Sequence, residues 1–137
     1  MARRFRSIAH TADTGLIAYG NDLPEAFANA AYGMFSIIAD LRAVKETEAR
    51  VVEVTGTDTE SLLFEWLNRL LYFFDVEMLL LKRFDITKFD GKMLRARCYG
   101  EKFDSSRHKI KTGVKSATYY QLQVDKAKNK VRVIFDI

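Results

Sequence analysis

The sequence contains few residues of the kinds that cross-link a chain, interrupt its secondary structure or make its backbone flexible. Its 137 residues include one cysteine, Cys98, one proline and seven glycines. A single cysteine excludes an internal disulfide and indicates a reducing compartment. With 48% hydrophobic and 29% charged residues, the composition also excludes a disordered chain. The length suits one ordinary domain, which we expect to span residues 1–137.

Long uninterrupted hydrophobic runs are also missing. The basic start, residues 1–6, is not followed by an apolar run of signal-peptide length. The most apolar stretch, residues 62–81, contains Glu65, Arg69 and Asp75, and charges are costly inside a bilayer. We therefore expect a cytoplasmic protein without a membrane partner.

Motifs of independent catalysis are absent as well. There is no phosphate-binding glycine loop, no zinc-ligand spacing and no nucleophile elbow, and no internal repeat is found. In residues 92–99, Cys98 alternates with Arg95 and Arg97 and shares a face with Leu94 and Ala96. This alternation predicts a buried core cysteine rather than a nucleophile.

Two helices are predicted from capping patterns and helical periodicity. The first opens at Asp22 and Glu25, which have capping-box spacing, and the second opens at Thr57 and Glu60, which have the same spacing. Each is followed by buried-type residues at helical intervals. These are Phe27, Ala31, Met34 and Ile38 in the first helix, and Leu63, Trp66, Leu67, Leu70, Leu71 and Phe74 in the second.

Strands are predicted where β-branched residues or alternation lie between turns. The predicted strands are residues 4–9, 16–20, 51–56, 84–89, 92–99, 114–124 and 131–137. Asp90 and Gly91 supply a two-residue hairpin turn. Two helices among many hairpin-linked strands predict an α+β fold, a mostly antiparallel sheet covered by two main helices in a single domain.

The net charge of +4 conceals an asymmetry along the chain. Residues 1–81 hold 7 Lys and Arg against 12 Asp and Glu, a net charge of −5, whereas residues 82–137 hold 15 against 6, a net charge of +9. A basic second half could meet RNA phosphates or an acidic partner. The alternative is that these cations only solvate the outer faces of strands.

The segment His10–Gly15 and the end of the sequence together suggest a cation site. We expect the segment to connect two strands, a common place for functional side chains. Asp136 is followed by Ile137, the last residue of the sequence. If the fold brings Asp13 beside them, carboxylates about 4 Å apart repel by roughly 4 kcal/mol at an effective dielectric near 20. A hard divalent cation bound by their oxygens would relieve this repulsion.

Two further expectations concern Asp13 and Asp136. The alternative to a cation ligand is an Asp13 that only forms a turn or caps nearby amides. The alternation of residues 131–137 places Asp136 on the face of Arg132 and Ile134, so we expect partial burial of its carboxylate.

Short stretches along the whole sequence match one known family in order and spacing. They are His10–Asp13, Gly15–Leu16, Ala18–Gly20, Glu25–Phe27, Asn29–Ala31, Trp66–Asn68, Leu70–Tyr72, Gly100–Glu101, Arg107–His108, Ile110–Thr112, Val114–Lys115, Ala117–Tyr119 and Val133–Ile137. Through these stretches the chain resembles the archease family. It departs from the family pattern at Gly113, where an acidic residue is common, and at Tyr120, where a histidine is frequent.

The resemblance implies an accessory protein, not an enzyme. Archeases activate the RtcB-type tRNA-splicing RNA ligase by promoting its guanylylation and multiple turnover, so the ligase is the implied partner, with tRNA or GTP at the interface. The resemblance also implies a divalent cation, calcium foremost and magnesium or manganese as alternatives. Its implied ligands are Asp13, Asp136 and Ile137, the last through main-chain or terminal oxygens.

Other residues and functions stay open. His10 could support the metal or act as a structural hydrogen-bonding group. Four residues could contact RNA, GTP phosphate or the ligase, or could form a solvated face: His108, Lys109, Lys111 and Lys115. The rival functions are a chaperone-like module for a tRNA-modifying enzyme such as a cytosine methyltransferase, and a metal-dependent phosphoesterase.

Overall fold

A computed structural model describes residues 3–10 and 13–137, apart from the side chains of His10 and Asp13. Its elements follow in chain order. They are β1 (Phe5–His10), β2 (Asp13–Tyr19), α1 (Leu23–Ile38), the short 3-10 helix η1 (Leu41–Ala43), β3 (Glu48–Thr55), α2 (Thr59–Glu77), β4 (Leu79–Phe89), β5 (Met93–Lys102), β6 (Ser116–Ala117), β7 (Gln123–Asp125) and β8 (Lys130–Asp136).

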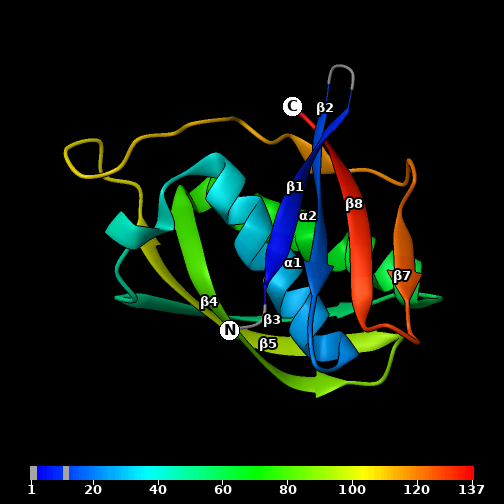
Figure 1. Ribbon diagram of the computed structural model, residues 1–137. Helices are drawn as coiled ribbons and strands as arrows, with labels where there is room; N and C mark the ends of the chain where they lie inside the picture. The colour runs from blue at the N-terminus through cyan, green and yellow to red at the C-terminus, as the bar shows by residue number, and fades with distance from the viewer. Residues whose placement is uncertain (1–2, 11–12) are drawn as a thin grey trace.

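The strands of the described residues form two sheets in which every pairing is antiparallel. One sheet has five strands in the order β1-β2-β8-β6, with β7 also paired to β8, and the other has three in the order β3-β5-β4. The helices α1 and α2 lie between the sheets and contact strands of both (Figure 1). The predicted α+β domain is confirmed, but its helices separate two sheets instead of covering one.

The first helix begins where its capping residues predict. The Asp22 side chain accepts a hydrogen bond from the Glu25 backbone N–H at 2.8 Å, and the Glu25 carboxylate accepts one from the Asn21 N–H at 2.7 Å. The predicted stripe of Phe27, Ala31, Met34 and Ile38 is fully buried. Packing of this apolar stripe against both sheets stabilises α1 in place.

The second helix begins one residue later than predicted. Asp58 is the N-cap, accepting from the Ser61 N–H at 2.7 Å, while the Ser61 hydroxyl accepts from the Asp58 N–H at 3.1 Å. The predicted pair of Thr57 and Glu60 is wrong because serine completes the box in place of glutamate. Trp66 then donates its indole N–H to the Phe27 carbonyl at 3.0 Å, which ties α2 to α1.

Most strands lie where they are predicted, but β3 begins at Glu48 and β4 at Leu79, three and five residues before the predicted starts. The β4–β5 hairpin turns at the predicted place, but its connection has three residues, Asp90, Gly91 and Lys92, instead of two, with Gly91 at φ +90°. The predicted strand over residues 114–124 is wrong, since Gln121 adopts a left-handed φ of 54° in a turn that separates β6 from β7. The connection predicted at residues 10–15 is too long, because His10 ends β1 and Asp13 already begins β2.

Candidate metal site

The ladder between β2 and β8 joins the two ends of the sequence. Thr14 pairs with Phe135, and Gly15 pairs with Ile134. Antiparallel partners step in opposite directions, so continuing this register by one residue sets the backbone of Asp13 opposite that of Asp136. Figure 1 shows the C terminus beside the start of β2. The side chain of Asp13 lies outside the described residues.

A third strand adjoins the same end of β8. Ser116 of β6 pairs with Asp136, and the Lys115 backbone N–H donates to the Asp136 carbonyl oxygen at 2.8 Å. The backbone of Asp136 is therefore flanked by β2 on one side and β6 on the other. Lys115, which is exposed, is the predicted contact residue that the structure brings to this edge.

Asn68 of α2 holds β6 in place through both ends of its amide. Its Nδ2 donates to the Ala117 carbonyl at 3.2 Å, and its Oδ1 accepts from the Ala117 N–H at 2.8 Å. Asn68 was not among the predicted site residues. The sequence does carry a signal for its role. Asn68 is an amide side chain among the buried helix residues Trp66, Leu67 and Leu70, and a polar group in such a setting needs a hydrogen-bond partner.

The carboxylate of Asp136 is more exposed than its position in the strand predicts. Ile134 is buried at 1% exposure, as expected, yet Asp136 is exposed and Ile137 is 40% exposed. The expected partial burial of Asp136 is wrong because β8 ends there, beyond the part of the strand that the core covers. A ligand at this edge would be approached from the surface.

The donor chemistry of this edge fits a hard cation. Carboxylate and carbonyl oxygens are the ligands that calcium, magnesium and manganese favour. Among the side chains that the structure describes, a set that omits His10 and Asp13, no group of three or more His, Cys, Asp or Glu could hold a metal ion. The set of Asp13, Asp136 and Ile137 is therefore a prediction supported by backbone register.

His108 lies in a buried network and not at this edge. Its Nδ1 accepts from the Asp104 N–H at 2.9 Å, and its Nε2 lies 2.8 Å from the Glu101 carboxylate. The Arg107 guanidinium, at 2.7 Å, is the main cause that lowers the pKa of Glu101 to about 2, with further hydrogen bonds from the Lys45 N–H and His108. This arrangement favours a structural role for His108.

Of the remaining candidates, Lys109 and Lys111 are exposed, and the side chain of His10 lies outside the described part of the chain. The backbone N–H of Lys111 donates to the Ile38 carbonyl at 2.7 Å, which places it at the end of α1, and Lys109 lies two residues before it. At Gly113 an added side chain would meet no atom within 4 Å, and Tyr120 is 54% exposed. Both departures from the family pattern therefore lie at the surface, where they leave the core packing unchanged.

Comparison with known proteins identifies the family. Residues 5–137 match the model of the archease protein family. Protein archease of Saccharolobus islandicus is 42% identical over 134 residues (97% of this chain, 96% of the relative), and that of Pyrococcus abyssi is 40% identical over 127 residues (90% and 89%). The solution structure of Methanobacterium thermoautotrophicum protein 1598 superposes with a TM-score of 0.81 at 37% identity, covering 98% of this chain and 99% of that one. No described helix is long and apolar enough to cross a membrane. With matches that span nearly the whole sequence, the chain belongs to the archease family.

Proposed function

We propose that this chain is a non-catalytic activator of the RtcB-type tRNA-splicing RNA ligase, working in the cytoplasm where it promotes ligase guanylylation and repeated turnover. Membership of the archease family supports the accessory role. The observation that supports the proposal is the antiparallel register of β2 and β8: Thr14 pairs with Phe135, so the next pair outward would be the backbones of Asp13 and Asp136. In this proposal Asp13, Asp136 and a main-chain or terminal oxygen of Ile137 bind a divalent cation, calcium foremost.

The exposure of Asp136 decides how such a site could act on a partner. A bound cation would supply positive charge for phosphate oxygens during nucleotidyl transfer, a step governed by position and electrostatics. The chain itself contributes oxygen donors at the end of β8, where a partner surface can reach them. The backbone of Lys115 and the pairing with β6 hold the Asp136 backbone at this edge. No nucleophile from this chain is needed for that role.

A guanylylation assay with purified ligase tests the proposal. We expect Asp13→Ala to abolish the stimulation of ligase guanylylation, because the cation loses a charged ligand. Asp75→Ala removes the same charge from an exposed position on α2 and is the matched control. Full stimulation by Asp13→Ala, with the control also active, would contradict the proposed role.

Calcium binding gives a readout that needs no ligase. In isothermal titration, Asp13→Ala and Asp136→Asn should each weaken calcium binding at least about tenfold, while Asp75→Ala should not change it. Stimulation of a tRNA cytosine methyltransferase without any effect on the ligase would favour the chaperone-like alternative. Hydrolysis of phosphodiesters by this chain alone would favour the phosphoesterase.

A further inference from the structure

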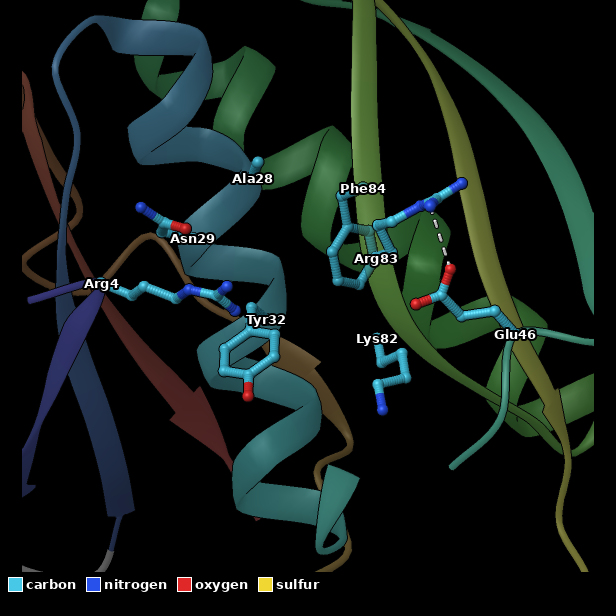
Figure 2. A pocket seen from close by; sticks show the side chains of 8 residues that line it. All are labelled: Arg4, Ala28, Asn29, Tyr32, Glu46, Lys82, Arg83 and Phe84. Atoms are coloured by element: carbon cyan, nitrogen blue, oxygen red, sulfur yellow. Dashed lines mark ion pairs between the residues drawn. The ribbon is translucent and has the colours of Figure 1, made fainter. Parts of the chain in front are cut away.

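A basic pocket opens between α1 and β4, away from the β2–β8 edge. Its volume is about 340 Å³, at the lower end of the range for small-molecule sites. Its polar lining comes from the residue before β1, from α1, from the segment before β3 and from β4 (Figure 2). These residues are Arg4, Asn29, Tyr32, Glu46, Lys82 and Arg83.

The cations of this pocket differ in how far they are neutralised. Arg83 forms an ion pair with Glu46 at 3.2 Å, drawn in Figure 2, and its guanidinium lies 3.9 Å from the centre of the Tyr99 ring. By contrast, no carboxylate of the described residues lies within 4.0 Å of the charged groups of Arg4 or Lys82. Arg4 and Lys82 therefore leave uncompensated positive charge in a concave site.

Both free cations are held by contacts that leave hydrogen-bond donors available. The Arg4 guanidinium lies 4.4 Å from the centre of the Tyr32 ring, and stacking on a ring occupies the guanidinium face but not its N–H edges. The Lys82 ammonium donates to the Val44 carbonyl at 2.8 Å, which uses one of its three N–H bonds. Such positioned donors suit phosphate oxygens.

A second hollow continues the pocket past Arg4. Its volume is about 450 Å³, and it shares Arg4 and Asn29 with the first pocket while adding Arg3. The carboxylate of this hollow, Glu25, accepts a hydrogen bond from the Asn21 N–H at 2.7 Å. Asn29 donates to the Tyr19 carbonyl at 2.6 Å and so fixes the wall that the two hollows share. The two hollows therefore adjoin at Arg4 and Asn29, and together they are larger than one phosphate group requires, with basic residues in both.

We propose that this basic groove, defined by Arg3, Arg4, Asn29, Tyr32 and Lys82, binds the phosphate backbone of single-stranded RNA. Grooves that track a single strand of nucleic acid carry positive charge along the path of its backbone. The choice of RNA rests on the proposed function, whereas the preference for phosphates rests on the groove alone. A free nucleotide would fill only the first pocket.

Fluorescence anisotropy with a short labelled single-stranded RNA, in the absence of ligase, tests this inference. Arg4→Glu and Lys82→Glu should each weaken RNA binding about tenfold or more. Lys128→Glu, which makes the same charge change at an exposed site in the turn between β7 and β8, should weaken it less than about threefold. Lys82→Ala should reduce the slope of log affinity against log salt by about 0.7, the value for one phosphate contact on a single strand.

Structural and competition measurements complete the test. Circular dichroism checks that each variant is folded, and the side-chain amide resonances of Asn29 should shift when RNA is added to the wild-type protein. Equal weakening by all three glutamate variants would show general charge attraction and overturn the proposal. If GTP displaces the RNA at concentrations near the dissociation constant of GTP for this protein, the site is a nucleotide pocket and the proposal is overturned. Because no ligase is present, none of these results depends on guanylylation.

Discussion

Glu101 is a carboxylate with only 6% of its surface exposed, and its hydrogen bonds join distant parts of the chain. It accepts from the Arg107 guanidinium at 2.7 Å, from the Lys45 N–H at 3.0 Å and from His108 Nε2 at 2.8 Å. His108 Nδ1 accepts from a backbone N–H, so the hydrogen on Nε2 is the one that faces Glu101. A buried carboxylate that accepts this many hydrogen bonds stabilises the fold. Removing it leaves each donor without an acceptor.

The first prediction concerns the pH dependence of this carboxylate. Hydrogen bonding from Arg107 is the main cause that lowers the pKa of Glu101 from 4.5 to about 2. The ionised group therefore contributes its full stabilisation above about pH 4.5, and this contribution is lost as the pH falls towards 2. Glu101→Gln should lower the free energy of unfolding at pH 7 by about 1–3 kcal/mol and flatten its decline between pH 4.5 and 2. Urea unfolding at a series of pH values measures both effects.

An exposed carboxylate provides the control. Glu65→Gln, on the outer side of α2, should leave the free energy of unfolding unchanged to within about 0.5 kcal/mol at every pH. An unchanged decline in Glu101→Gln would show that other groups dominate the acid response.

Single residues also show where sequence patterns succeed. Cys98 is buried, as strand alternation predicts, and burial raises the pKa of its thiol to about 12. His108 is the opposite case: it follows Arg107 in a basic polar stretch that suggests a surface, yet its ring is buried against Glu101. Alternation applies within a strand, whereas a loop residue is placed by partners distant in sequence.

At the scale of elements, Gly100 lies where the neighbouring strands leave no room for a side chain. It lies in β5 between Glu48 of β3 and Leu81 of β4, next to an irregularity in the register of β4. A Cβ at this position would overlap the carbonyl oxygen of Leu80, a backbone atom that cannot move without disturbing the strand.

The second prediction compares two glycines. Gly100→Ala should reduce the free energy of unfolding by at least about 2 kcal/mol, since the added methyl forces the strands apart. Gly113→Ala should change it by less than about 1 kcal/mol, because the added atom meets nothing within 4 Å. Urea denaturation of both variants makes the comparison, and equal stability would refute the close approach of β4 and β5.

The third prediction concerns the contact between α2 and β6. Asn68→Ala removes both hydrogen bonds to Ala117, so β6 should detach more readily from α2 and the free energy of unfolding should fall by about 1–3 kcal/mol. Because β6 flanks Asp136, the proposed calcium site should also weaken, which isothermal titration measures.

The adjacent exposed residue serves as the comparison for Asn68. Arg69→Ala should leave calcium affinity unchanged, because Arg69 is the next residue of the same helix and points to solvent. If Asn68→Ala lowers stability but not calcium affinity, Asn68 is only structural.

The predicted elements differ in how far local signals determine them. Both helices and the β4–β5 hairpin carry their own caps, periodicity and turn residues, so the sequence predicts them well. The division of residues 114–124 depends on Gln121 adopting a left-handed φ and on Asn68 from another element. The pairing of β2 with β8 joins segments that are distant in sequence, so local patterns raised the meeting of Asp13 with Asp136 only as a condition, and the family resemblance made it an expectation.

At the scale of the whole molecule, charge is organised by the fold and not by halves of the sequence. The first 81 residues are acidic overall, yet Arg3 and Arg4 from that half join Lys82 from the basic half in one groove. A count along the chain therefore predicts that basic surface exists but not where it lies. The sandwich of α1 between the sheets brings these residues together.

The last prediction follows from the distance between the proposed metal site and the basic groove. Asp13 begins β2 and Tyr19 ends it, and the Tyr19 N–H donates to the Arg4 carbonyl at 2.8 Å. With about 3.3 Å per strand residue, the backbones of Asp13 and Tyr19 lie about 20 Å apart, and Tyr19 is the residue hydrogen-bonded to Arg4 of the groove. This exceeds the Debye length of about 8 Å at physiological ionic strength, so charges at one site are screened from the other.

Binding at the two sites should therefore be independent. Lys82→Glu should leave calcium affinity within about twofold of wild type, and Asp136→Asn should leave RNA affinity within about twofold at ~0.15 M salt. The double variant should show the sum of the two single effects, because distant sites without shared partners are additive to within about 0.5 kcal/mol. Isothermal titration and anisotropy on the four proteins complete this cycle. A loss of calcium affinity in Lys82→Glu would show that the two sites are coupled, and the groove could then not be separate from the edge that holds Asp136.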